Sequence, residues 1–292
     1  MKQIDTDLYR VKDKISLNNC DTYENFGEDD SELKKQLEKV RRALGEFQDT
    51  LYAHGKYSVL VCLQGMDTSG KDSLIREVFK DFNVRGVVVH SFKVPTELEL
   101  KHDYIWRHYI ALPPKGKVGV FNRTHYENVL VTRVHPEYIM GEHIPGVHSV
   151  DDINEEFWRK RFEQINNFEK HISDNGTIIF KFFLHLSKEE QRKRLLRRLH
   201  LQKKNWKFSP GDLKERKLWD DYQTCYEDAI NKTSKQHAPW FVVPADNKKA
   251  ARLIVANTLL QELKKYKDIK EPELDDKIKA NLEEYKNQLE KE

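Results

Sequence analysis

The stretch Gly65-Met66-Asp67-Thr68-Ser69-Gly70-Lys71-Asp72-Ser73 decides the fold of this chain. It has the spacing G-x-x-x-x-G-K of a phosphate-binding loop, in which backbone N–H groups and a lysine surround phosphate oxygens. The mostly apolar run before it, residues 57–64, predicts a buried parallel strand, and residues 74–79 carry apolar side chains at helical spacing. A strand, a glycine-rich turn and a helix N-terminus together present N–H groups and a positive dipole end to an anion. This context disfavours the alternative, a chance match in an ordinary loop.

The side chains of the loop suggest how it binds phosphate. We expect phosphate contacts from Lys71, as a mobile charge for the transferred phosphoryl group, and from Gly65, Ser69, Gly70, Asp72 and Ser73. Asp72 stands where Ser or Thr usually follows the lysine, and Asp67 lies inside the loop. A carboxylate repels phosphate unless a cation lies between them, so Asp67 predicts a divalent metal ion. Capping of the following helix is the alternative for both aspartates. For Asp72 both interpretations stay open.

Composition narrows the class of protein. The chain has 292 residues, 38% of them hydrophobic and 34% charged, and its net charge of +3 results from 51 basic and 48 acidic residues. This length allows one large domain or two small ones, and the composition is not that of a disordered chain. Three cysteines without metal-ligand spacing fit a reducing cytoplasm. No apolar run approaches the ~18 residues of a membrane span, and there is no signal-peptide core, so we expect a soluble cytoplasmic protein.

Strand and helix patterns alternate along the chain. Apolar runs predict five strands, at residues 57–64, 86–92, 117–121, 177–184 and 240–244. Helical patterns lie between and around them, at residues 30–54, 97–110, 124–133 and 151–174. This alternation predicts an α/β fold, a three-layer sandwich with a five-stranded parallel sheet and helices on both faces. We divide the chain into an N-terminal helical extension (1–56), a core (57–266) with a helical lid at about 187–235, and a C-terminal helix (267–292).

Polar residues follow the third predicted strand. Ligands of open parallel sheets bind at the carboxyl ends of the strands, so we expect these residues to face the phosphate loop. Asn122 lies where an acidic metal ligand is usual. Arg123 is placed to stabilise charge on a transferring phosphoryl group, with a surface ion pair as the alternative. Glu127 could serve a metal, a substrate ammonium group or neither, and Arg133 could contact another phosphate.

The predicted lid is rich in basic residues. Arg194 and Arg198 share one helical face, and Lys204 and Lys207 follow. Cations packed this densely repel one another, so a polyanion such as a nucleic acid or a chain of phosphates is the natural partner. A solvated basic face is the alternative. The position of the run, where a kinase lid is expected, favours the polyanion.

In these motifs the chain resembles the polyphosphate kinase type 2 family, which moves phosphoryl groups between inorganic polyphosphate and nucleotides. The resemblance covers residues 57–260 and includes the phosphate loop. Its further motifs are Pro95-Thr96-Glu97, Trp106-Arg107, Phe121-Asn122-Arg123-Thr124-His125-Tyr126-Glu127, Arg133-Val134-His135, Lys204-Asn205-Trp206-Lys207, Trp219-Asp220-Asp221-Tyr222, Ala238-Pro239-Trp240 and Pro244-Ala245-Asp246. Several signatures in the right order are far more specific than the loop alone.

The resemblance implies a P-loop kinase-like core with a helical lid, dependence on Mg²⁺ (or Mn²⁺), and polyphosphate in a basic channel. Asp67 would hold the metal, and Lys71, Arg123, Asn122, Arg194 and Arg198 would form the catalytic set. We further expect Lys204, Lys207 and Arg133 to contact phosphate, and Asn122, Glu127 and Arg133 to contact the nucleotide. Many members have Asp where this chain has Asn122, and the Asn form is similar to the subgroup that acts on both nucleoside mono- and diphosphates.

The expected function is therefore Mg²⁺-dependent, reversible phosphoryl transfer from polyphosphate to AMP or ADP. The expected partners are polyphosphate, AMP, ADP, ATP and guanine nucleotides, with no membrane or nucleic acid, and a homo-oligomer (dimer or tetramer). Two alternatives stay open. One is an ATP-dependent nucleoside monophosphate kinase of thymidylate-kinase type. The other is a nucleic-acid-binding P-loop NTPase, against which the absence of RRM, KH and zinc-finger signatures argues.

Overall fold

A single five-stranded sheet forms the centre of the protein. The computed structural model describes residues 4–292, except for the side chains of Lys203, Lys204 and Lys207. The strands are β1 (Ser58–Gln64), β2 (Val87–Ser91), β3 (Val118–Asn122), β4 (Thr177–His185) and β5 (Trp240–Pro244). They lie in the order β2-β3-β1-β4-β5, and every neighbouring pair is parallel. The predicted α/β fold and its five strands are confirmed. The predicted phosphate contacts of Lys204 and Lys207 lie outside the described side chains.

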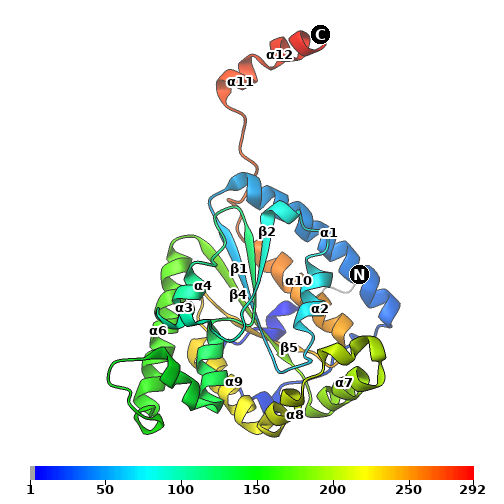
Figure 1. The fold of residues 1–292 in the computed structure, drawn as a ribbon. Helices are drawn as coiled ribbons and strands as arrows, with labels where there is room; N and C mark the ends of the chain where they lie inside the picture. The colour runs from blue at the N-terminus through cyan, green and yellow to red at the C-terminus, as the bar shows by residue number, and fades with distance from the viewer. Residues whose placement is uncertain (1–3) are drawn as a thin grey trace.

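Helices cover both faces of the sheet, which gives three layers (Figure 1). Val59, Val61 and Leu63 of β1 pack into one core, whereas Leu60 and Cys62 pack into another on the opposite face. This alternation is the period-two geometry of a strand buried on both sides. The first face is covered by α1 (Asp30–His54), α2 (Lys71–Val78) and α10 (Lys248–Leu263), the second by α6 (Glu155–Asp174) and α9 (Trp219–Thr233).

The N-terminal segment is built into this body. The Asp29 side chain caps α1 by accepting hydrogen bonds from the N–H groups of Ser31 and Glu32. Gly55 ends the helix with a φ of 67°, a conformation that glycine adopts without steric cost. An isolated β-bridge joins Arg10 to Phe241 of β5, and α1 packs along α10.

Three predicted helices are shorter or broken. The predicted helix 97–110 is two short helices, α3 (Glu97–Leu100) and α4 (Trp106–Tyr109), because the Asp103 side chain accepts from the N–H groups of Ile105 and Trp106 and begins a new turn. The predicted helix 124–133 is the 3₁₀ turn η4 (His125–Val129) followed by α5 (Val131–Val134). The predicted helix 151–174 is the 3₁₀ turn η6 (Val150–Asp152) followed by α6. Further short 3₁₀ turns include η1 (Thr6–Tyr9), η2 (Leu17–Asn19), η3 (Val84–Gly86) and η5 (Pro136–Glu142).

The stretch predicted as the lid contains α7 (Lys188–His200), the 3₁₀ turn η7 (Gln202–Lys207), α8 (Pro210–Lys217) and α9. The helices differ in burial. The side chains of Trp219, Tyr222, Tyr226 and Ile230 in α9 are buried in the core, whereas α8 has no buried residue. Two short helices, α11 (Asp276–Ala280) and α12 (Leu282–Leu289), project from the body as a C-terminal arm (Figure 1). Among residues 4–292, no helix is long and apolar enough to cross a bilayer.

Candidate active site

The phosphate loop joins β1 to α2 at the carboxyl end of the sheet. Gly65 and Gly70 have φ angles of 148° and 108°, which favour glycine. A Cβ atom at Gly65 would lie 2.9 Å from both the carbonyl oxygen of Leu184 and the hydroxyl oxygen of Ser69. The N–H of Ser69 donates to the carbonyl of Met66 (3.1 Å) and closes the turn. The loop therefore requires glycine at its first position for close packing as well as for backbone shape.

The Lys71 side chain folds back into the phosphate loop. Its Nζ donates to the Gly65 carbonyl at 2.6 Å and lies 3.4 Å from that of Met66. Burial lowers the pKa of this ammonium group, and the nearby carboxylate of Asp67 opposes that shift. The charge is held where the loop turns, so phosphate oxygens bound there would meet it directly.

Arg123 and Asp67 face each other across the mouth of the loop. Arg123 Nη2 lies 3.5 Å from Asp67 Oδ1, and both side chains are partly exposed. Burial alone would lower the pKa of Arg123, but the carboxylates of Glu127 and Asp67 raise it overall. Arg123 has a φ of 59°, and a left-handed conformation in a residue other than glycine costs about 1–2 kcal/mol. Such strain is typical of functional sites, where it fixes the direction of a side chain.

Glu127 belongs to the same cluster of charges. It lies in η4, one turn after Arg123. Burial raises the pKa of its carboxyl group, whereas the charges of Arg123 and Lys71 oppose the rise. The loop lysine, the arginine after β3 and this carboxylate therefore act on one another electrostatically, as the sequence predicted for residues at the carboxyl ends of β1 and β3.

Asn122 ends β3 beside the first turn of α2. Its Nδ2 donates to Asp72 Oδ1 at 2.7 Å and lies 3.4 Å from the Ser91 hydroxyl. Asp72 is thus held by Asn122, and α2 has no side-chain cap. The Ser73 hydroxyl donates to the Gly70 carbonyl (2.9 Å). Asn122 Oδ1 is buried and accepts no hydrogen bond within the described part of the chain.

The oxygen atoms around the loop fit a magnesium ion that is also bound to phosphate. Among the described residues, no three His, Cys, Asp or Glu side chains gather closely enough to hold a metal alone. Mg²⁺ commonly uses only one or two carboxylates and takes its other ligands from water and substrate phosphates. Asp67 supplies an accessible carboxylate beside the loop, and an unpaired buried oxygen such as Asn122 Oδ1 costs about 1–3 kcal/mol unless a ligand or water satisfies it.

Helix α7 packs directly against the loop. Gln191 Nε2 donates to the Asp67 carbonyl (3.2 Å). Arg194 Nη1 donates to the carbonyls of Thr68 (2.9 Å) and Ser69 (3.0 Å). One turn further on, Arg198 Nη1 donates to Asp212 Oδ2 in α8 at 3.0 Å. Burial and the charge of Asp67 raise the pKa of Asp212, so this carboxylate also lies within electrostatic range of the loop.

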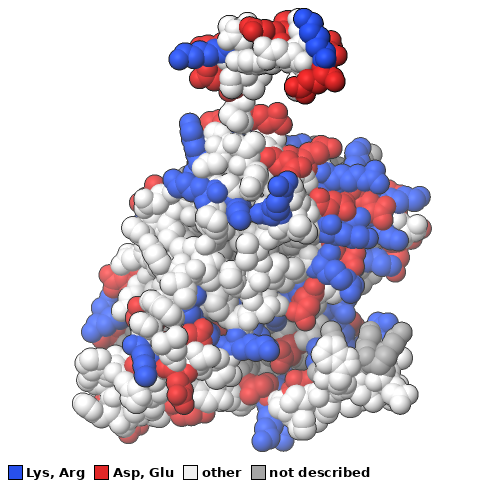
Figure 2. All heavy atoms as spheres, turned by 45° about the horizontal axis from the view of Figure 1, so that its top comes forward, with Lys and Arg blue, Asp and Glu red and all other residues white. Residues whose placement is uncertain are grey.

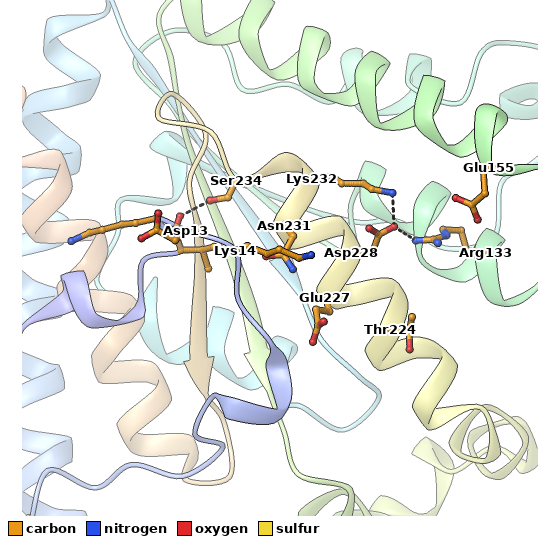
Figure 3. Close-up of a pocket in the computed structure, with 12 residues that line it drawn as sticks. Asp13, Lys14, Arg133, Glu155, Thr224, Glu227, Asp228, Asn231, Lys232 and Ser234 are labelled. Carbon is orange, nitrogen blue, oxygen red and sulfur yellow. Dashed lines mark hydrogen bonds and ion pairs between the residues drawn. The ribbon is translucent and has the colours of Figure 1, made fainter.

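Arg133 lies in a different environment. Its Nη1 donates to Asp228 Oδ2 at 2.6 Å, and its guanidinium group lies over the rings of Trp158 and Phe162. Figure 3 shows it on the wall of a pocket of about 640 Å³ between α9 and the N-terminal segment, with Lys232 bound to the same carboxylate. No contact of Arg133 with the described residues joins it to the phosphate loop, so the structure does not bring it together with Lys71 and Arg123.

Two residues near the loop were not predicted from the sequence. Tyr226 of α9 is buried. Burial and the charges of Glu127 and Asp67 raise the pKa of its hydroxyl group, whereas a hydrogen bond with the Gly65 backbone opposes the rise. Lys248 begins α10, and a Cβ atom at Gly70 would lie 3.7 Å from its Cε. The available signal for Tyr226 was its spacing from Tyr222, because residues one turn apart in a predicted helix lie on the same face. Nothing local distinguishes Lys248.

Known proteins resemble this chain over most of its length. The family model described as "Polyphosphate kinase 2 (PPK2)" matches residues 27–271. The chain is 46% identical over 235 residues to an ADP-polyphosphate phosphotransferase of Rhodopseudomonas palustris, covering 80% of this chain and 79% of the relative. It is 46% identical over 227 residues to an AMP/ADP-polyphosphate phosphotransferase of Meiothermus ruber, covering 78% and 79%.

A solved structure extends the likeness to the fold. The crystal structure of polyphosphate kinase 2 from Arthrobacter aurescens TC1 superposes with a TM-score of 0.86 at 36% identity, covering 96% of this chain and 95% of that one. The family model and the relatives span the phosphate loop, the turn after β3 and the helices that follow. The chain therefore belongs to the polyphosphate kinase 2 family and is a phosphotransferase.

Proposed function

We propose that this protein transfers the terminal phosphoryl group of inorganic polyphosphate to AMP or ADP, and runs the reverse reaction from ATP. The observation that carries the proposal is the arrangement of Asp67, Lys71 and Arg123 around one phosphate loop. The names of the two relatives, one acting on ADP and the other on AMP or ADP, support the choice of donor and acceptors. Three free cysteines among the described residues support a cytoplasmic enzyme.

The chemistry needs little from the protein beyond position and charge. An oxygen of the acceptor's terminal phosphate attacks the end phosphorus of polyphosphate, the bond to the next bridging oxygen breaks, and the chain leaves one phosphate shorter. The acceptor oxygen is already largely ionised near neutral pH, since its second pKa is about 6, so no side chain has to remove a proton. No covalent enzyme intermediate is involved.

Each residue of the cluster has a proposed task. Lys71 and the N–H groups of the loop, including those near Ser69, Gly70 and Ser73, hold phosphate oxygens. Arg123 stabilises the negative charge that develops on the phosphoryl group during its transfer. Asp67 and Asn122 would hold Mg²⁺ (or Mn²⁺), which neutralises phosphate charge and orients the two substrates. Asp72 contributes indirectly, through its hydrogen bond with Asn122.

The acceptor nucleotide is proposed to lie towards β3 and η4. Asn122 and Glu127 are the candidate contacts, and the Glu127 carboxylate would accept from a donor such as a ribose hydroxyl. The presence of Asn122, where many family members have Asp, supports the use of both AMP and ADP as acceptors. We include guanine nucleotides among the proposed acceptors. Arg198, Lys204 and Lys207 are proposed to contact the phosphate chain from the lid. The contacts of Arg133 favour a structural role instead, through Asp228.

A comparison of donors tests this proposal. Purified protein with Mg²⁺ and AMP or ADP receives either polyphosphate or ATP, and the nucleotides are separated by chromatography. We expect ADP and ATP to form with polyphosphate as donor. Product from AMP only when ATP is the donor would instead indicate a nucleoside monophosphate kinase of thymidylate-kinase type. Salt-dependent nucleic-acid binding without any nucleotide product would indicate the third alternative, a nucleic-acid-binding NTPase.

We extend the proposal to a homo-oligomer, a dimer or tetramer, in which the C-terminal arm (residues 271–292) binds a second copy of the chain. Leu274, Ile278, Tyr285 and Leu289 of the arm are exposed, and helices this short are not stable alone in water. The arm has eight acidic and four basic residues, a net charge of −4.

A complementary surface lies where the arm leaves the body. Lys56, Lys115 and Lys270 are exposed there, and their segments touch: His54 Nδ1 lies 3.2 Å from the Lys270 carbonyl, and the N–H of Gly116 donates to the Tyr57 carbonyl at 2.6 Å. Figure 2 shows lysine and arginine side chains at the foot of the arm. Light scattering on the full chain tests the contact. The double variant Ile278→Ser/Leu289→Ser should have a lower mass than the wild type, and the control Asn287→Ser/Gln288→Ser should not. Equal masses in all three would contradict it.

A further inference from the structure

Arg194 uses every donor it has on the protein itself. Its Nε donates to Glu190 Oε1 (2.8 Å), and its Nη1 donates to the carbonyls of Thr68 and Ser69. Its Nη2 donates to the carbonyls of Ala245 (2.7 Å) and Asp246 (2.8 Å) in the turn between β5 and α10. The guanidinium group has five N–H donors, and all five have an acceptor. The residue is also buried, with 8% of its surface exposed.

We propose that Arg194 is a positioning residue that braces the phosphate loop from the side opposite the substrates, rather than a lid arginine that contacts phosphate. To reach a phosphate, the guanidinium would have to release carbonyls that would then be left buried without a donor, which is costly. A charged donor to two successive loop carbonyls is, in contrast, a strong and directional restraint.

This restraint acts on the part of the loop that binds phosphate. In a trans peptide the C=O and N–H groups point in opposite directions. Holding the Ser69 carbonyl against α7 therefore directs the N–H of Gly70 away from Arg194, towards the phosphate side. Thr68, which supplies the first of these two carbonyls, has a φ of 66°, a strained conformation for a residue with a side chain. Gln191 holds the preceding carbonyl, that of Asp67, so α7 fixes three successive peptide groups.

The same contacts limit which part of the lid moves. Arg194 ties α7 to both the loop and the β5–α10 turn, so α7 is part of the rigid body that shapes the site. Helix α9 is buried in the core. The stretch between them, η7 and α8, carries Lys204, Lys207 and Asp212, and Arg216 joins α8 to α7 by donating to Gln191 Oε1 (2.7 Å).

Hydrogen exchange on the protein without substrates tests the brace. Arg194→Lys keeps the positive charge but cannot bridge two pairs of carbonyls, and Arg192→Ala removes an exposed α7 arginine whose partner among the described residues is Glu189. We expect backbone amides of residues 65–73 to exchange at least about tenfold faster in Arg194→Lys and at the wild-type rate in Arg192→Ala. Wild-type exchange of the loop in Arg194→Lys would overturn the proposal. Gln191→Ala, which removes only one of the three loop contacts, should give a smaller increase, and it provides the same test if Arg194→Lys folds poorly.

Kinetics provide a second arm, which rests on the proposed function. Loss of a positioned loop should lower kcat about 100-fold in both Arg194→Lys and Arg194→Ala, with the KM for polyphosphate changed less than about threefold. A lysine that preserved most of the turnover, together with a large rise of KM in the alanine variant, would show a direct phosphate contact and overturn the proposal. Failure of the wild type to use polyphosphate would count against the proposed function alone, because the exchange experiment needs no substrate.

Discussion

Glu169 of α6 and Lys181 of β4 form an ion pair whose side chains are both fully buried. Lys181 Nζ donates to Glu169 Oε2 at 2.6 Å, and also to the Tyr126 hydroxyl and the Thr233 carbonyl at 2.8 Å each. Glu169 Oε1 accepts from the Tyr126 hydroxyl (2.7 Å) and lies 3.1 Å from His125 Nε2. His125 and Tyr126 lie between Arg123 and Glu127 in the chain, so this network fixes the turn that carries two residues of the site.

We predict that Lys181→Met lowers the free energy of unfolding by about 3–5 kcal/mol, because it leaves the carboxylate of Glu169 buried without a charge partner. At about 2 °C per kcal/mol for a protein of this size, the melting temperature should fall by about 6–10 °C. The double variant Lys181→Met/Glu169→Leu removes both charges. It should be more stable than Lys181→Met alone, since a buried pair replaced by apolar side chains costs far less than a broken one.

Urea unfolding followed by tryptophan fluorescence and circular dichroism measures these differences. Lys170→Met is the matched control, because Lys170 pairs on the same helix with Asp174 and both side chains are exposed. That pair should contribute less than about 1 kcal/mol. A loss of under about 1 kcal/mol for Lys181→Met, equal to the control, would refute the reasoning. So would a double variant no more stable than the single one, because the cost would then not arise from the unpaired charge.

Three further predictions concern the cluster around the loop. Asp67→Asn should raise the Mg²⁺ concentration needed for half-maximal transfer about tenfold, and an unchanged Mg²⁺ titration would exclude Asp67 as the metal ligand. Arg123→Ala should lower kcat by about 10³ with little change in the KM for nucleotide, because the arginine acts on the phosphoryl group in flight, and a raised KM at constant kcat would contradict this. Burial raises the pKa of Glu127 above its ordinary value of 4.5, so its carboxylate is lost as the pH falls through that raised value. The transfer rate should fall as this carboxylate is protonated, and Glu127→Gln should remove this pH dependence. An identical pH profile in the variant would show that ionised Glu127 is not required.

The fold was predictable because its signals are local. Each strand is a short run of apolar residues bounded by polar or turn residues, and the glycines of the phosphate loop mark the turn between β1 and α2. Where the prediction failed, a single side chain had captured backbone groups. Asp103 starts α4 by accepting from two N–H groups, and Thr124 accepts from the Tyr126 N–H and starts a 3₁₀ turn. Periodicity does not report such local competition.

The site was predictable in its residue types but not in their contacts. Lys71, Asp67 and Arg123 follow from the loop motif and from the rule that strand ends converge. Four of the five acceptors of Arg194 are backbone carbonyls, those of residues 68–69 and 245–246, which no side-chain pattern reveals, so charge alone suggested a phosphate contact. In the same way, the partner of Arg133 is Asp228, 95 residues away in the chain.

The measurement that tests the central claim most directly is the transfer of labelled phosphate. Polyphosphate carrying ³²P is incubated with AMP, Mg²⁺ and either the wild type or Lys71→Ala, and the nucleotides are separated. We predict label in ADP and ATP with the wild type and none above background with Lys71→Ala, whose circular dichroism should match the wild type. Unlabelled nucleotide products with the wild type, or equal transfer by a natively folded Lys71→Ala, would contradict the account.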